Sequence, residues 1–487
     1  MISNPSNNGL QKRLNPINVW AIAFGCIIGW GSFINPGKKF LPNSGVAGTG
    51  IAMVLGALIM VIIAFSYAYM VPKYPKAGGE FHFTKACFGK RCAFLCGWFL
   101  VAAYLTNVPM NSTAIGLIVD GVFGPVLKFG FHYSIAGFEV YLGEILLASS
   151  VLVLFGLFNI RGVKVAGFVQ TCLAAGLIVS VTTLTVAALC SPLTNLENMA
   201  PIWGFDKSAA VQVYQATGVA TAEGFERGGS AIAVSILSTL AIAPWAFVGF
   251  DTIPQAAEEF KFSHKKVSFI MIVAIAFGCF VYVANNTITA AALANWPELI
   301  INSEGTPWLL LTAAEKLLGP VGKVLVGVAV SCAVLSGIMG FYLASSRLMY
   351  SMACDGYLPE AFGKVDARFG TPRNAVLFCM LISLTGPVLG REALGWFLDM
   401  SAIGASIGFG FTCLATLRTM KRDGDGSPFL KWMATLGAIF SGAFIVLQTV
   451  PIPGLSGVNF CTESYIMLIV WVALGLGFYV AKQKNFN

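Results

Sequence analysis

GCIIGWGS, residues 25–32, lies in the middle of an apolar segment that extends from about residue 14 to residue 37. A second apolar segment, residues 232–259, contains the stretch FVGFDTIP at residues 247–254. In hydrocarbon, an unwound backbone persists only where protein covers it or where it lines a polar cavity. We therefore expect two membrane helices, one in each half of the chain, that are interrupted at their middles and border a polar site.

The composition of the chain places it among membrane proteins. Of its 487 residues, 57% are hydrophobic and only 11% are charged, which is more apolar surface than a soluble core of this size needs. A hydrocarbon core of ~30 Å requires ~20 apolar residues per helix. We predict an all-α protein with twelve transmembrane helices, near residues 14–37, 40–72, 92–119, 140–160, 165–190, 232–259, 267–293, 321–350, 374–389, 393–417, 432–450 and 464–481.

Lysine and arginine are distributed unequally between the predicted loops. With the N-terminus inside, the tails and the even-numbered loops hold 22 of the 30 basic residues. This asymmetry predicts that both termini are cytoplasmic in a multi-pass protein of the cell membrane. The net charge of +8 then reflects contact with anionic lipid headgroups, and no nucleic-acid partner is expected. The polar residues 1–13 contain no apolar region before a cleavage site, so no signal peptide is predicted.

The number of spans between the two interruptions predicts an inverted repeat. Five spans are an odd number, so a first unit that starts inside at residue 14 ends outside, where a second unit starts at residue 232. Many secondary transporters have this 5+5 arrangement, with helices 1 and 6 broken near the midplane. The predicted divisions are a cytoplasmic tail, a first repeat, an extracellular loop, a second repeat and helices 11 and 12, at residues 1–13, 14–190, 191–231, 232–417 and 432–481.

The first interruption suggests the kind of solute that would bind. A helix that stops in the membrane leaves carbonyls with partial negative charge, and the half-helix that restarts offers N–H groups with partial positive charge. A zwitterion suits both ends. Amides near Gly29, Trp30 and Gly31 would hold a carboxylate, and the carbonyl of Ile27 would accept from an ammonium group. The alternative is that the glycines only permit close helix packing.

The second interruption supplies the remaining backbone groups and an acid. Carbonyls of Trp245 and Val248, beside Gly249, would complete the ammonium site, and Pro254 would open the second half-helix. Asp251 is a functional candidate, because an acid in an unwound membrane segment is energetically expensive. It is a proton site coupled to substrate, a counter-ion for a cationic substrate, or a cap of the half-helix.

Motifs along the chain resemble those of the amino acid, polyamine and organocation transporters, whose members share the leucine-transporter fold. The resemblance covers roughly residues 17–422. Besides the two interrupted stretches, it rests on YPKAGGE at residues 74–80, ASSR at 344–347, DGYLP at 355–359 and GTP at 370–372. It implies that an amino acid binds through its carboxylate at the first-span glycine motif and through its amine at the carbonyls of both interruptions.

The resemblance also implies side-chain contacts from the third and eighth spans, at Asn107, Met110 and Phe341. Asn107 lies in mid-span and needs a hydrogen-bond partner, which is either the substrate or a neighbouring helix. The alternative for Met110 and Phe341 is a core or lipid-facing position. Trp30 stands where relatives usually have a small residue, so the cavity is expected to be smaller or to present an aromatic wall.

The coupling ion is left open by the sequence. Many relatives keep a lysine in the fifth span in place of a sodium ion, and residues 165–189 contain none. This leaves a sodium site built from first-span carbonyls and an eighth-span hydroxyl such as Ser336, or proton coupling through Asp251. The outer loop at residues 121–138 contains no cysteine, so no disulfide-linked heavy chain is expected.

The resulting prediction is a permease that moves a small, neutral α-amino acid by alternating access, coupled to protons or sodium or by exchange. The alternative is a transporter of polyamines or ethanolamine, because the carbonyls and Asp251 would also serve a substrate without a carboxylate. An enzyme would need clustered catalytic groups, and the three histidines lie in or beside predicted loops, so no catalytic residue, metal or cofactor is predicted. A channel would need pore-lining rings or filter loops.

Overall fold

The computed structural model describes residues 10–135, 137–303, 308–391, 393–452 and 459–481. Residues 1–9 of the predicted tail lie outside this part of the chain. Within the described residues, nine helices are long and apolar enough to cross a membrane. Three shorter apolar helices lie in the predicted first, sixth and ninth spans, at Pro16–Ile27, Ser230–Leu240 and Arg373–Leu389. The protein is therefore a helical membrane protein, as its composition predicts.

The α-helices, in chain order, are α1 (Pro16–Ile27), α2 (Gly31–Asn35), α3 (Leu41–Lys73), α4 (Glu80–Phe123), α5 (Leu142–Ile160), α6 (Val163–Cys190), α7 (Lys207–Thr217), α8 (Ser230–Leu240), α9 (Ala243–Ala246), α10 (Thr252–Gln255), α11 (Val267–Ala292), α12 (Trp296–Ile301), α13 (Leu309–Leu318), α14 (Pro320–Cys354), α15 (Arg373–Ser383), α16 (Gly386–Leu389), α17 (Ala393–Asp423), α18 (Pro428–Thr449) and α19 (Thr462–Ala481). A π-helical turn at Pro36–Phe40 joins α2 to α3. Short 3-10 turns occur at Glu197–Met199, Ala257–Glu259, His264–Lys266 and Glu360–Gly363.

The first predicted interruption is present between α1 and α2. Asn15 caps the start of α1, because its side chain accepts from the backbone N–H of Asn18 at 2.8 Å. The helix ends at Ile27, and Ile28 is extended, with φ −92° and ψ 95°. Helical structure restarts at Gly31. The second half of this span continues through the π-helical turn into the start of α3, where Gly45, with φ +59° and ψ −157°, interrupts the helix. The second apolar segment follows this kink.

The second predicted interruption is more extensive than the first. It divides the sixth apolar segment into α8, α9 and α10, with non-helical turns at residues 247–251. Gly249 has φ +140°, a conformation that residues with a side chain rarely adopt. Pro254 is the third residue of α10 rather than its first. The backbone therefore unwinds around the glycine, as the sequence predicts.

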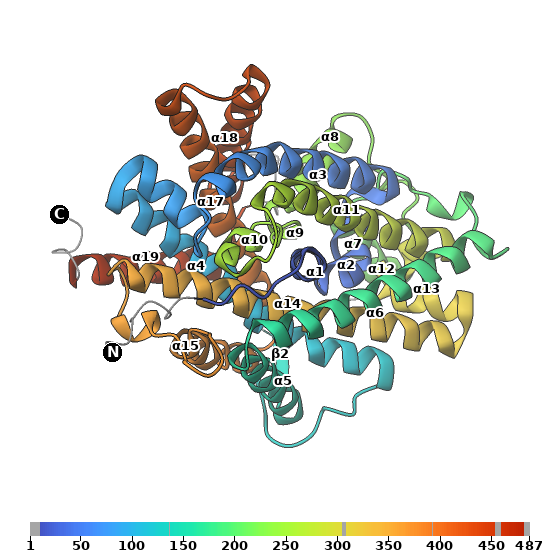
Figure 1. Ribbon diagram of the computed structural model, residues 1–487. Helices are drawn as coiled ribbons and strands as arrows, with labels where there is room; N and C mark the ends of the chain where they lie inside the picture. Colours follow the sequence, from blue (N-terminus) through green and yellow to red (C-terminus); the bar gives the residue numbers. More distant parts are fainter. Residues whose placement is uncertain (1–9, 136, 304–307, 392, 453–458, 482–487) are drawn as a thin grey trace, which may run out of the picture.

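Segments from the two halves of the chain are interleaved around the interruptions. Figure 1 shows α1 and α2 near the centre of the molecule, beside α9 and α10, with α14 and α6 on one side and α3 and α11 on the other. Most of the buried hydrophobic side chains form one continuous core that includes both interrupted stretches. The unwound backbone is thus covered by protein, which is the condition for its stability in hydrocarbon.

Two predicted connections contain regular structure. The loop after α4 forms a hairpin of strands β1 (His132–Ile135) and β2 (Phe138–Tyr141), with His132 opposite Tyr141. The range of α4 starts at Glu80 rather than near residue 92, because it includes a short helical segment that a kink at Gly89, with φ +81°, separates from the long apolar segment. The loop at residues 191–231 contains α7 and packs against α12.

Candidate functional site

A small cavity lies where the two interruptions meet. Its lining residues are Cys26, Ile27, Gly29, Trp30, Asn107, Met110, Asn111, Trp245, Val248, Tyr282 and Phe341. Eight of the ten predicted substrate-binding residues are therefore brought together by α1, α4, α9 and α14 and by the turns beside them. No charged side chain belongs to this lining.

The two remaining predicted residues, Gly31 and Gly249, set the spacing of the interruptions. A Cβ atom on Gly31 would lie 2.3 Å from the ring of Trp245. A Cβ atom on Gly249 would lie 2.6 Å from the backbone nitrogen of Ile27. Both distances are far below van der Waals contact, so only glycine lets the two unwound segments approach this closely. From the sequence, close helix packing is the alternative role of the glycines. At Gly31 and Gly249 this close packing brings the two interruptions together.

The cavity is contracted in this conformation. Its volume is about 10 Å³, which is room for about one water molecule. The rings of Trp30 and Trp245 lie 5.9 Å apart between centroids and occupy much of the space. Trp30 thus makes the cavity small and gives it an aromatic wall. A solute larger than water would enter only after these walls separate.

Two polar side-chain atoms among the lining residues are buried without a hydrogen-bond partner, the Trp30 Nε1 donor and the Asn111 Oδ1 acceptor. The amide nitrogen of Asn111 donates to the carbonyl of Asn107 at 2.8 Å, which fixes the orientation of the side chain. Its Oδ1 lies 3.5 Å from the position of a Cβ on Gly29 and so faces the first interruption. Buried polar groups normally have partners, so this pair indicates a ligand.

The sequence did not single out Asn111, although it lies four residues after Asn107 and therefore on the same helix face. Cys26 and Tyr282 are further lining residues that were not predicted. Asn107 itself uses its amide nitrogen on the carbonyl of Ala103, at 2.7 Å, and on Ser401 Oγ, at 2.6 Å. One hydrogen bond within α4 and one to the neighbouring α17 therefore already occupy the amide nitrogen of Asn107.

Backbone groups at both interruptions also lack backbone partners. Within the described residues, the N–H groups of Gly29 and Trp30 donate to no carbonyl, and the carbonyls of Ile27 and Val248 accept from no backbone N–H. The carbonyl of Trp245 already accepts from the N–H of Val248 at 3.2 Å. The cavity is thus bordered by free donors at one end of the first interruption and free acceptors at the ends of both helices.

Asp251 is fully buried but does not belong to the cavity lining. Its Oδ1 accepts from the backbone N–H of Gly249 at 2.7 Å, and its Oδ2 accepts from the hydroxyl of Tyr104 at 2.9 Å. The side chain makes no capping hydrogen bond to α10. Its partners therefore lie at the interruption itself and on α4, rather than in the half-helix that follows.

Ser336 lies against the first span. Its hydroxyl is 3.1 Å from the carbonyl of Gly25 and 2.9 Å from the carbonyl of Ala333 on its own helix. From the fifth predicted span, Gln170 donates its amide nitrogen to the carbonyl of Ala21 at 3.1 Å. That nitrogen lies 2.3 Å from the position of a Cβ on Gly25. A neutral donor therefore packs against α1 on the side where Ser336 binds it.

Comparison with known proteins identifies the family. A family model described as amino acid permease matches residues 14–476. The chain belongs to this family. The permease is 26% identical over 377 residues to the human large neutral amino acids transporter small subunit 2, in an alignment that covers 77% of this chain and 64% of the relative. The chain thus spans less than two thirds of that relative's length.

Two bacterial relatives align with the permease over almost their whole length. The branched-chain amino acid permease BcaP of Bacillus subtilis is 23% identical, with 98% of this chain and 94% of the relative aligned. The methylthioribose transporter of the same organism is 22% identical, with 98% and 95% aligned. These names all describe transporters, but they differ in the solute, so membership of the family does not by itself give the substrate.

A buried ion pair lies at the 3-10 turn that follows α10 in the permease. Arg347 Nε lies 2.8 Å from Glu259 Oε1, and both side chains are fully buried. The carbonyl of Glu259 accepts from the backbone N–H groups of Arg13 and Leu14, at 2.8 and 2.9 Å. These contacts tie the segment before α1 and the end of the second interruption to α14.

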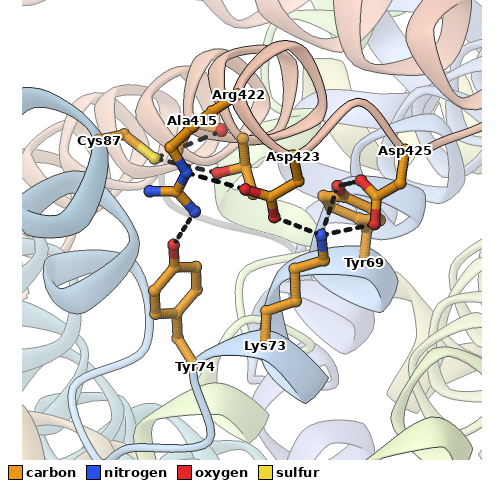
Figure 2. Close-up of polar contacts among 9 residues, drawn as sticks. Tyr69, Lys73, Tyr74, Cys87, Ala415, Arg422, Asp423 and Asp425 are labelled. Carbon is orange, nitrogen blue, oxygen red and sulfur yellow. Dashed lines mark hydrogen bonds and ion pairs between the residues drawn. The ribbon is translucent and has the colours of Figure 1, made fainter.

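A second polar cluster joins the end of α3 to the end of α17. Figure 2 shows Lys73 between two acids, at 2.7 Å from Asp423 and 2.8 Å from Asp425. Tyr69 also donates to Asp425, and Arg422 donates to Tyr74 at 2.9 Å. The hydrogen bonds from Lys73 and Tyr69 lower the pKa of Asp425 below its usual value. The cluster is partly exposed, in contrast to the ion pair of Arg347.

Proposed function

We propose that this permease is a secondary active transporter that moves a small, neutral α-amino acid across the membrane by alternating access. The observation that carries this proposal is the cavity between the two interruptions, with its unpartnered Trp30 Nε1 donor and Asn111 Oδ1 acceptor. A carboxylate requires donors and an ammonium group requires acceptors. An α-amino acid presents both groups a few ångströms apart.

The backbone determines how such a solute would lie. The free N–H groups of Gly29 and Trp30 and the indole N–H of Trp30 would donate to the carboxylate. The free carbonyls of Ile27 and Val248, with Asn111 Oδ1, would accept from the ammonium group. Met110 and Phe341 would contact the side chain of the solute. Since none of the described residues that line the cavity is charged, a neutral side chain is favoured.

The membrane arrangement that we propose is a 5+5 inverted repeat of twelve helices, with repeats at residues 14–190 and 232–417 and both termini in the cytoplasm. Two features support it. The interruptions occur at the first apolar segment of each proposed repeat, and the shorter apolar helices supply spans that length alone does not identify. Helices α18 and α19 correspond to spans 11 and 12 and lie outside the repeat.

Amine transport is the second candidate, and the surroundings of Asp251 weigh against it. A counter-ion for a polyamine would have to face the substrate. Asp251 does not line the cavity, and each of its carboxylate oxygens already accepts a hydrogen bond from the protein. We therefore assign Asp251 to coupling. Hydrogen-bond donors of the protein already occupy both carboxylate oxygens of Asp251, which favours the proton over a sodium ion as the coupled ion.

Uptake by proteoliposomes tests the function directly. Purified protein is reconstituted, and uptake of labelled neutral amino acids, cationic amino acids, diamines and ethanolamine is measured with an imposed pH gradient, an imposed sodium gradient, or internal unlabelled substrate. We expect saturable uptake of neutral α-amino acids. Uptake of diamines that neutral amino acids do not inhibit would favour the amine transporter. The absence of transport for every zwitterion would contradict the proposal.

A further inference from the structure

A second acid lies next to Asp251 and is not part of the cavity. Glu80, the first residue of α4, is fully buried. Its Oε1 accepts from the hydroxyl of Tyr67 on α3 at 2.8 Å, and its Oε2 accepts from the amide of Gln255 on α10 at 2.5 Å. The Glu80 carboxyl group on α4 is thus hydrogen-bonded to α3 and to α10. Helix α10 belongs to the second interruption.

Tyr104 connects this acid to Asp251. The Tyr104 hydroxyl lies 2.9 Å from Asp251 Oδ2 and 3.5 Å from Glu80 Oε1. The same hydroxyl accepts from the amide of Gln255 at 3.2 Å. A single hydroxyl group therefore separates two buried carboxyl groups that are 171 positions apart in the chain. Hydrogen bonds in such a buried network strengthen one another.

No basic side chain of the described residues forms an ion pair with either acid. The other titratable groups that face them are the hydroxyls of Tyr67 and Tyr104 and two thiols, Cys26 beside Asp251 and Cys96 beside Glu80. Two neighbouring carboxylates without a cation would place two uncompensated negative charges in the protein interior, at a high free-energy cost. Retaining one proton between the two acids removes one of these charges.

Gln255 provides an independent indication that the network holds a variable proton. Its Oε1 is buried without a hydrogen-bond partner, while its Nε2 serves Glu80 and Tyr104. Rotation of the amide by half a turn exchanges the two atoms. The oxygen would then accept from a proton on Glu80 Oε2, where the nitrogen now donates. When the proton is on Oε1, which faces Tyr104, Oε2 remains an acceptor for the Gln255 nitrogen without rotation. Gln255 can therefore satisfy Glu80 in either protonation state.

We propose that Glu80 and Asp251 together form the proton-coupling site of this permease, with Tyr104 as the relay between them. A proton on Asp251 Oδ2 passes to the Tyr104 oxygen while the hydroxyl proton of Tyr104 passes to Glu80 Oε1. Tyr104 is unchanged, Asp251 becomes a carboxylate and Glu80 becomes a carboxylic acid. One proton is thereby moved from the second interruption to the start of α4. This inference rests on the proposed function.

The start of α4 is fastened to the helix that would move during transport. The N–H of Gly78 donates to the carbonyl of Gln255 at 3.4 Å, and a Cβ on Gly79 would lie 2.5 Å from Pro254. Rearrangement of α10 therefore changes the contact between Glu80 and Gln255. Residues 77–79, directly before Glu80, are buried, and the chain reaches solvent at Pro75 and Lys76.

The variant Glu80→Gln tests the proposal, because it keeps the shape of the side chain and removes its titration. Two assays are compared in proteoliposomes: accumulation driven by a pH gradient, and exchange of labelled for unlabelled amino acid without a gradient. For the wild type, one pH unit supports about tenfold accumulation if one proton accompanies each substrate. We expect Glu80→Gln to lose this accumulation and to retain exchange. The matched control is Asp399→Asn, a membrane-helix acid that binds Ser464 outside the network.

The second variant, Tyr104→Phe, removes the relay hydroxyl and retains the ring that stacks on Phe341. Like Glu80→Gln, it is expected to lose accumulation driven by the pH gradient and to retain exchange. If Glu80→Gln does not fold, Tyr104→Phe tests the proposal on its own. Gradient-driven accumulation equal to the wild type in either folded variant would overturn the proposal. So would wild-type exchange that no pH gradient affects, although the proposed function would then stand. A wild type without amino acid transport in either assay would instead contradict the function itself.

Discussion

Asn111 is the residue whose contribution to binding the structure makes most specific. Its Oδ1 is a buried acceptor that faces the first interruption and has no partner. We predict that Asn111→Ala raises KM about thirtyfold, because a hydrogen bond to a charged group contributes about 2 kcal/mol. The control is Thr106→Ala on the same helix, whose hydroxyl binds its own backbone at Ala102. The concentration dependence of uptake gives the KM of each variant. An unchanged KM in Asn111→Ala would show that Asn111 does not bind the substrate.

At the scale of the element, the two interruptions behave as one interlocked unit. Gly249 packs its backbone on Ile27 and Cys26, and its φ of +140° suits only glycine. We predict that Gly249→Ala destabilises the protein by about 2 kcal/mol or more, from backbone strain and overpacking together, and abolishes uptake. The control is Gly395→Ala in α17, where a Cβ meets open space. Thermal unfolding in detergent measures both, and equal melting temperatures would contradict the interlock.

The cluster at Lys73 joins two elements by charge, so its effect depends on pH. Since hydrogen bonds from Lys73 and Tyr69 lower the pKa of Asp425, the cluster stabilises the folded protein at pH values above about 4, the usual value for aspartate. Its contribution is lost as the pH falls further. We predict that acidification from pH 6 to pH 3 lowers the melting temperature of the wild type more than that of Lys73→Met. Lys431→Met serves as the control, and a larger acid sensitivity in Lys73→Met would refute this.

At the scale of the whole molecule, the orientation of the chain can be tested with its own cysteines. Cys190 ends α6 and Cys354 ends α14, and both are exposed. The proposed topology places Cys190 outside and Cys354 inside. We predict that a membrane-impermeant maleimide labels a variant with Cys190 as its only cysteine in intact cells, and labels the corresponding Cys354 variant only after permeabilisation. The opposite pattern would invert the topology.

Features formed by residues that are adjacent in the chain could be predicted from the sequence, whereas features formed by contacts between distant segments could not. The interruption at Gly29 to Gly31 was predictable, because its glycines are adjacent in the chain and its hydrocarbon setting follows from composition. Glu80 and Asn111 were not found in this way. Glu80 belongs to a motif at the end of a predicted loop, and its significance comes from Tyr67, Tyr104 and Gln255, which only the tertiary fold brings to it. The hairpin of β1 and β2 depends likewise on pairing that the loop composition did not indicate.

The contracted cavity between Trp30 and Trp245 has a consequence for the energetics of the cell. In a transporter whose unloaded cavity is wide and filled with water, ions can cross the membrane through that water whenever both sides open transiently. Here the resting centre admits about one water molecule. The unloaded protein is therefore expected to be electrically silent, so that a cell can keep many copies in its membrane without dissipating its ion gradients.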